Sequence, residues 1–98
     1  MVEKIIWSPK AISEYAGIID FLMMIWNIDI ILDFESLVNQ NILIISKNPD
    51  SYPIIEDNVR RVVIHKNVSI YYEFIVEQNT IKILSIFDNR QNPDRLKL

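Results

Sequence analysis

Apolar residues in the first half of the chain recur at helical spacing, and strand-like alternation replaces this pattern in the second half. Residues 2–7 form a short apolar run with β-branched side chains, which predicts a strand. Ser8 and Pro9 follow, and they suit the N-cap and the first position of a helix. The stripe expected to be buried on this helix has three- and four-residue spacing: Ile12, Tyr15, Ala16, Ile19, Leu22, Met23 and Trp26.

The same helix has a polar stripe, expected to face away from the core, and a second apolar edge. The polar stripe comprises Lys10, Ser13, Glu14, Gly17 and Asp20. The second apolar edge comprises Ile18, Phe21 and Ile25. A helix lying on a sheet needs one apolar stripe only. A second helix or a partner protein should therefore cover this edge.

A second helix is predicted directly after the first. Asn27 or Asp29 can cap its start, and Pro49 ends the pattern shortly after Lys47. Its apolar stripe comprises Ile31, Phe34, Val38, Ile42 and Ile45. The two helices should form an antiparallel hairpin with a tight link at residues 26–29.

The second half of the chain predicts a loop and then three strands. The loop covers residues 51–58, and the strands are expected at residues 59–64, 68–76 and 80–87. The last strand is apolar on both sides, so it should be central or covered. The order strand, helix, helix, three strands predicts an α+β fold. The hairpin should pack on one face of a twisted, mainly antiparallel sheet of about four strands, in a single domain over residues 1–98.

Alternation in the middle strand predicts one buried face. Its apolar residues are Val68, Ile70, Tyr72, Phe74 and Val76, and they alternate with Ser69, Tyr71 and Glu73. Tyr72 is therefore expected in the core and Tyr71 on the opposite, free face. That free face is where a ligand or a partner could bind.

Composition and charge narrow the class of protein. Ten Lys and Arg residues stand against thirteen Asp and Glu residues among 98, and this acidity disfavours binding of nucleic acid through its phosphates. The absence of cysteine excludes disulfides and thiolate metal sites and fits a reducing, cytoplasmic location. The apolar run at residues 21–28 is too short to span a membrane, and residues 1–4 show no signal-peptide pattern. We expect neither a metal nor a cofactor, because no ligand cluster or nucleotide-binding motif is present.

The residues with candidate chemistry are three arginines, a tyrosine and a histidine. Arg60 and Arg61 are adjacent on one strand and should point to opposite faces, so one of them should lie at the rim or pair with a carboxylate. Arg90 follows the last strand, where it could bind an anion or pair with Asp88. Tyr71 could lie beside whichever arginine shares its face. His65, in a predicted turn, is expected to be exposed.

The chain resembles the RelE/ParE superfamily of toxins from type II toxin–antitoxin modules. Five fragments carry this resemblance in order along the chain: Trp7-Ser8-Pro9-Lys10-Ala11, then Trp26 with Phe34, then Asn48-Pro49, then Arg60-Arg61 with Ile70-Tyr71-Tyr72, and finally Phe87-Asp88-Asn89-Arg90-Gln91-Asn92-Pro93.

The resemblance implies a cytoplasmic toxin that inhibits growth, supports plasmid stabilisation and is neutralised by a cognate antitoxin. RelE-like members cut mRNA on the ribosome, whereas ParE-like members inhibit DNA gyrase. The tail after Arg90 has neither Tyr nor His, so the acid or base that RNA cleavage needs is not evident. This favours a ParE-like toxin acting on a protein target such as gyrase. The alternatives are a ribosome-dependent endoribonuclease that uses Arg60, Arg61, Arg90 and Tyr71, and a degenerate member without toxicity.

Overall fold

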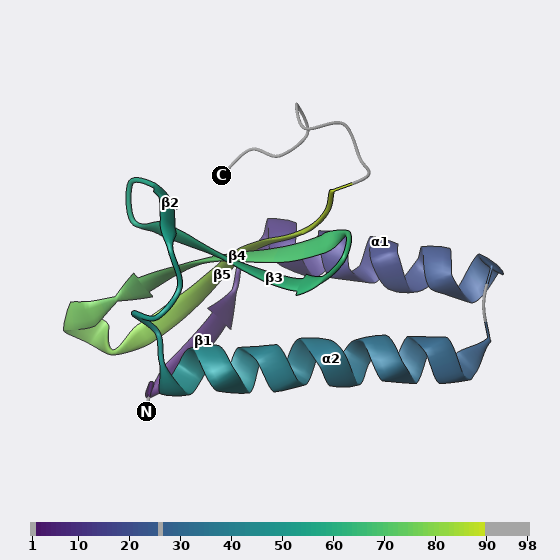
Figure 1. Ribbon diagram of the computed structural model, residues 1–98, viewed down its shortest axis with the longest axis horizontal. Coiled ribbons are helices and arrows are strands. Elements are labelled where there is room, and N and C mark those ends of the chain that lie inside the picture. Colours follow the sequence, from purple (N-terminus) through teal and green to yellow (C-terminus); the bar gives the residue numbers. More distant parts are fainter. Residues whose placement is uncertain (1, 26, 90–98) are drawn as a thin grey trace.

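Two long helices lie on one face of a five-stranded sheet (Figure 1). The structure is a computed structural model, and it describes residues 2–25 and 27–89. A 3-10 turn, η1, covers Val76–Gln78. The other elements, in chain order, are β1 (Lys4–Trp7), α1 (Pro9–Ile25), α2 (Ile28–Lys47), β2 (Ile54–Glu56), β3 (Val59–His65), β4 (Val68–Ile75) and β5 (Thr80–Asp88).

The sheet has the order β1-β5-β4-β3-β2 and is mainly antiparallel. β1 pairs in parallel with β5, and the remaining pairs are antiparallel. The α+β fold and the one-sided hairpin are therefore confirmed. So is the central place of β5, which lies between β1 and β4.

The predicted loop at residues 51–58 was wrong in part, because it contains the edge strand β2. β2 is only three residues long, and all three are exposed. It therefore has no apolar alternation that a sequence pattern could reveal. Asp57 has a φ of 47°, in the left-handed region, and it closes the tight turn between β2 and β3.

The ends of both helices lie where the capping residues predict them. The Ser8 hydroxyl accepts a hydrogen bond from the Ala11 N–H at 3.0 Å, and Asn27 Oδ1 accepts one from the Ile30 N–H at 3.2 Å. At the other end of α2, the Asn48 N–H donates to the carbonyls of the preceding turn, directly before Pro49. Local chemistry therefore fixes the length of the hairpin.

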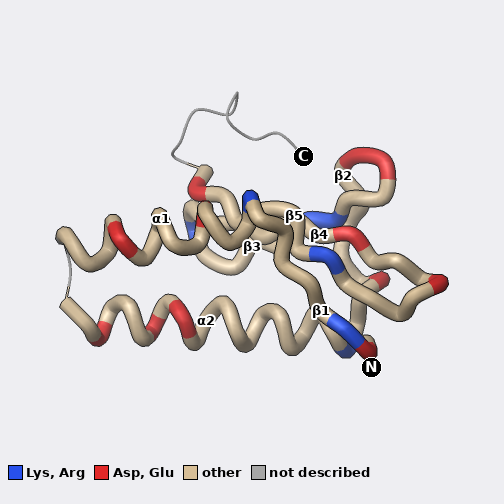
Figure 2. The backbone as a smooth tube through the Cα atoms, turned by 180° about the vertical axis from the view of Figure 1, so that it is seen from behind, with Lys and Arg blue, Asp and Glu red and all other residues tan. Residues whose placement is uncertain are grey.

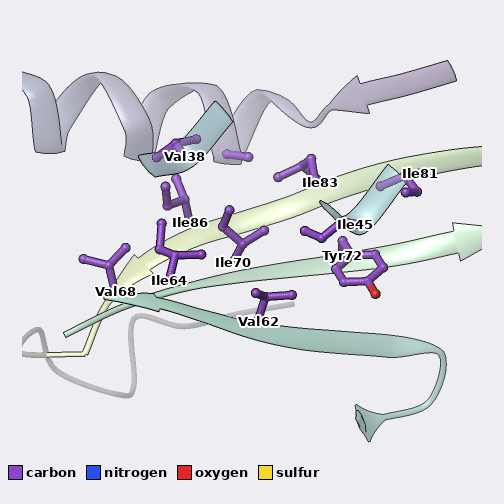
Figure 3. Close-up of a cluster of buried hydrophobic side chains, with 11 residues drawn as sticks. Val38, Ile45, Val62, Ile64, Val68, Ile70, Tyr72, Ile81, Ile83 and Ile86 are labelled. Atoms are coloured by element: carbon purple, nitrogen blue, oxygen red, sulfur yellow. The ribbon is translucent and has the colours of Figure 1, made fainter. Parts of the chain in front are cut away.

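The main core fills the space between the sheet and the hairpin (Figure 3). Val38 and Ile45 of α2 meet side chains from the centre of the sheet, among them Ile70, Ile83 and Ile86. Each of these five residues is at most 1% exposed. Burying side chains of this size contributes about 1.5–3 kcal/mol each, so this layer dominates the stability of the fold.

A second buried cluster lies apart from this layer and contradicts the expected exposure of Tyr71. Val59, Tyr71 and Phe87 are all less than 9% exposed, and Leu84 packs against them. Tyr71 and Tyr72 are consecutive residues of β4, so they point to opposite faces of the sheet and belong to different clusters. A bulge lies between them, because Tyr71 pairs with Ser85 whereas Tyr72 pairs with Ile83. β4 is therefore buried on both sides from Val68 to Tyr72, where alternation predicted one free face.

The rotation of α1 also differs from the prediction. Ala11 is fully buried and Ile18 packs against the core, whereas Ile12 and Met23 are more than half exposed. Glu14 belonged to the stripe expected to face away, yet it turns inward and accepts a hydrogen bond from the Ser85 hydroxyl of β5 at 2.8 Å. Apolar residues occupy several sides of α1, so their spacing alone cannot select the buried side. Trp26 lies outside the described residues.

Candidate functional site

The outer half of the hairpin extends beyond the sheet (Figure 1). An apolar groove of about 930 Å³ lies between this part of the hairpin and the end of the sheet. The strand residues that line the groove come from the end of β3, the start of β4 and the end of β5: His65, Val68, Ile86 and Asp88. The residues from α1 are Glu14, Gly17, Ile18, Phe21 and Leu22, and those from α2 are Ile30, Asp33, Phe34 and Leu37. A space of this size is sufficient for several side chains of a partner.

The walls of the groove are apolar side chains that the fold leaves uncovered. Phe21 is 48% exposed and Ile30 is 38% exposed, on facing helices. Gly17 precedes Phe21 by one turn of α1 and adds room, since a Cβ placed at this position would meet no atom within 4 Å. A groove with these walls favours an apolar occupant.

One wall of the groove carries a small polar network. Glu14 Oε1 accepts the hydrogen bond from Ser85, and Glu14 Oε2 lies 3.6 Å from Lys10 Nζ. The Lys10 ammonium is itself buried, and in the structure it makes no hydrogen bond. The network fixes the carboxylate in place and compensates its charge only in part.

An aromatic row supports the hairpin where it leaves the sheet. Tyr15 of α1 lies with its ring centroid 5.5 Å from that of Trp7 and 6.1 Å from that of Phe34. Burial raises the pKa of the Tyr15 hydroxyl, and the negative charge of Glu35 raises this pKa further. These contacts hold α1 and α2 side by side next to the groove.

Arg60 lies on the same face of the sheet as the hairpin but far from the groove, where it clamps the loop that follows α2. Its Nη1 donates to the Tyr52 carbonyl at 2.6 Å and to the Asp50 carbonyl at 3.0 Å. Its Nη2 lies 3.6 Å from the Asp50 carboxylate. The Tyr72 hydroxyl donates to the Pro49 carbonyl at 2.7 Å and secures the same loop. The guanidinium therefore already has partners within the chain.

Burial of Tyr72 has a chemical consequence in this clamp. Burial raises the pKa of the Tyr72 hydroxyl to about 12, although the positive charge of Arg60 acts in the opposite direction. The hydroxyl is therefore protonated at neutral pH and acts as a donor. As predicted, Tyr72 is a core residue.

The remaining candidate residues do not converge on one site. Arg61 is exposed on β3, and Arg90 lies outside the described residues. Tyr71 is 3% exposed, so the prediction that it would be exposed beside an arginine was wrong. His65 is exposed, as expected, and it lines the groove.

The groove itself was not predicted from the sequence, although two signals point to it. The first is the second apolar edge of α1, which supplies Ile18 and Phe21. The second is Gly17, the single glycine of the chain, in the middle of an otherwise well-formed helix. Neither signal shows that the hairpin extends past the sheet.

Two classes of site find no support in the part of the chain that the structure describes. None of its helices is long and apolar enough to cross a membrane. Within residues 2–25 and 27–89, no three His, Asp or Glu side chains are grouped so that they could hold a metal ion.

The fold matches that of a toxin–antitoxin protein of known structure. The similar structure is described as a chromosomal ParDE toxin–antitoxin system from P. aeruginosa, with a TM-score of 0.72 and 17% sequence identity. The match covers 87% of this chain and 94% of that chain. The two chains therefore share the same α+β fold.

A match to a family model identifies the class of protein. Residues 5–93 match the model described as ParE toxin of type II toxin–antitoxin system, parDE. No curated protein sequence matches the chain. The chain therefore belongs to the ParE toxin family of type II toxin–antitoxin systems. It is the toxin component of such a module, with an antitoxin as its partner.

Proposed function

We propose that the cellular target of this toxin is a protein, DNA gyrase, and that the toxin does not cut mRNA. The observation that carries this proposal is the state of Arg60 and Tyr71. Arg60 binds two backbone carbonyls and Asp50, and Tyr71 is buried. Attack by an RNA 2′-hydroxyl needs an acid, a base and a cation that can reach the phosphate.

The two exposed candidates do not restore this chemistry. Arg61 is exposed, but a guanidinium remains protonated in proteins and supplies charge without proton transfer. His65 lies in a groove whose described lining carries three carboxylates and neither Lys nor Arg. Such surroundings repel phosphate groups.

Expression of the chain with and without its antitoxin tests the proposal. We expect growth arrest without antitoxin, a DNA-damage response, intact mRNA and inhibition of supercoiling by purified gyrase. Codon-linked cleavage of mRNA would instead establish the RelE-like endoribonuclease. Absence of growth arrest would contradict both readings and identify a degenerate member. A Tyr71→Phe variant is a useful control: it should remain toxic if the hydroxyl has no catalytic role.

We further propose that the antitoxin places an apolar segment in the groove beneath the hairpin. Support comes from the exposed walls at Phe21 and Ile30, the volume of about 930 Å³ and the empty space beside Gly17. Covering such surface on binding is favourable in proportion to the apolar area removed from water.

A Gly17→Trp variant tests whether the antitoxin binds in the groove. The indole should fill the groove without disturbing the fold, because a side chain at this position extends into open space. We expect the toxin to arrest growth even when the antitoxin is co-expressed, and the purified complex to be lost. Ser13→Trp is the matched control, since Ser13 is exposed on the same helix and does not line the groove. Equal antitoxin binding by both variants would show that the antitoxin binds to another surface of the toxin.

A further inference from the structure

Between Lys10 and Lys47, the hairpin carries one sign of charge. Residues 11–46 contain Glu14, Asp20, Asp29, Asp33 and Glu35, and neither Lys nor Arg. Figure 2 shows these acidic positions on the two helices, whereas the basic positions lie toward the half of the molecule that holds the sheet. Apart from Lys10 and Lys47 near its ends, the hairpin is therefore both apolar and acidic, although the net charge of the whole chain is only −3.

Acidic side chains also line the groove itself. Glu14 comes from α1, Asp33 from α2 and Asp88 from the end of β5. Among the described residues that line the groove, none is Lys or Arg. An apolar segment that enters the groove is thus surrounded by carboxylates from three different elements.

Two of these carboxylates are suited to meet a cation from a partner. Asp33 is exposed on α2. Glu14 is held in place by Ser85, and its nearest cation, Lys10, is 3.6 Å away without a hydrogen bond. Carboxylates beside an apolar wall are less screened than carboxylates in open water, so they discriminate more strongly between cationic and anionic side chains.

We propose that the groove selects its occupant by charge: the antitoxin segment carries a Lys or Arg between its apolar side chains, and this cation binds at Asp33 and Glu14. This inference rests on the proposed binding of the antitoxin segment in the groove and adds the charge of the side chain that the groove binds. Antitoxin segments with neutral or acidic side chains at that position are rejected, because they leave the Asp33 carboxylate desolvated without a cation and add none beside Glu14. Asp33 and Glu14 thereby determine which antitoxin this toxin accepts.

Charge reversal at two positions of the hairpin tests the selection. The toxin is purified with its cognate antitoxin, and the dissociation constant of the complex is measured for Asp33→Lys and for the matched control Asp20→Lys. Both variants change the net charge by the same amount, but Asp20 does not line the groove. We expect Asp33→Lys to weaken the complex about tenfold or more, and Asp20→Lys to weaken it less than about threefold, through long-range attraction only.

Salt dependence and a charge swap complete the experiment. The affinity of the unaltered toxin should fall more steeply with salt than that of Asp33→Lys. Replacing the contacting Lys or Arg of the antitoxin with Glu should restore binding to Asp33→Lys.

Equal effects of Asp33→Lys and Asp20→Lys on the dissociation constant would overturn the proposed selection by charge. If Gly17→Trp still abolishes binding in that case, the proposal that the antitoxin binds in the groove is supported and only the proposed selection by charge is wrong. Retained binding by Gly17→Trp would overturn both. Asp33→Asn, which keeps the size of the side chain, guards against loss of fold and should weaken the complex to an intermediate degree.

Discussion

The Arg60 clamp and the groove lie near opposite ends of the hairpin, on the same face of the sheet, and use polar groups in opposite ways. At the clamp, the guanidinium and the Tyr72 hydroxyl are bonded to carbonyls of residues 49–52, so their hydrogen-bonding capacity serves the fold. At the groove, apolar side chains and the exposed carboxylate of Asp33 remain open to a partner. An arginine in a cluster of candidates is therefore weak support for a site until its partners within the chain are known.

The strongest expected effect is loss of stability at the clamp. Arg60→Ala removes two hydrogen bonds to carbonyls from a charged donor, and we expect a loss of about 2–3 kcal/mol in the free energy of unfolding. The ion pair adds little, because Asp50 is 75% exposed. Urea denaturation measures the loss. Arg61→Ala, at the neighbouring exposed position, should change stability by less than about 0.5 kcal/mol. Equal losses from the two variants would remove the distinction between the clamp and an ordinary surface charge.

A smaller effect is expected from the second donor of the clamp. Tyr72→Phe leaves the ring in the core and removes the hydrogen bond to Pro49, which should cost about 1 kcal/mol. Denaturation in urea near neutral pH measures the change. Retained stability would show that the loop after α2 is held without this hydroxyl.

The same variant should also change the dependence of stability on pH. The hydroxyl is neutral when protonated, and its pKa in the folded protein is raised from 10.0 to about 12. Its contribution to stability is therefore complete below pH 10.0 and is lost as the pH rises toward about 12. Denaturation at pH 8 to 11 should show a shallower alkaline decline for Tyr72→Phe than for the unaltered protein. Identical declines would contradict the raised pKa.

The smallest expected effect is a gain in stability from a substitution at the groove. Gly17→Ala should stabilise the chain by roughly 0.5–1 kcal/mol, because glycine is a poor residue inside a helix and the added methyl group meets no atom. Thermal unfolding measures the gain. A loss of stability would mean that the position is less open than the structure shows. Antitoxin binding should change little, since a methyl group fills only a small part of the groove.

The sequence predicted what local chemistry decides. Ser8, Asn27 and Pro49 mark the ends of the helices, because capping and proline effects act within a few residues. The family resemblance, carried by fragments along nearly the whole chain, is confirmed by the match over residues 5–93.

Features that depend on contacts between distant segments were not predicted. The edge strand β2 forms only because β3 lies beside it. The burial of Tyr71 depends on Val59 and Phe87 from the neighbouring strands, which alternation within one strand does not reveal. The groove depends on how far the hairpin extends past the sheet, and periodicity carries no information about that distance.

The position of β5 has a consequence for how the chain is made. β5 joins β1 to β4, yet it is the last strand in the described sequence. During synthesis the hairpin leaves the ribosome first, with its apolar sides uncovered, and the sheet that covers one of them closes only when residues 80–88 arrive. Through this interval the acidic residues of the hairpin favour solubility by mutual repulsion of nascent chains. The acidic residues that select a partner for the folded toxin can thus also keep the nascent chain soluble.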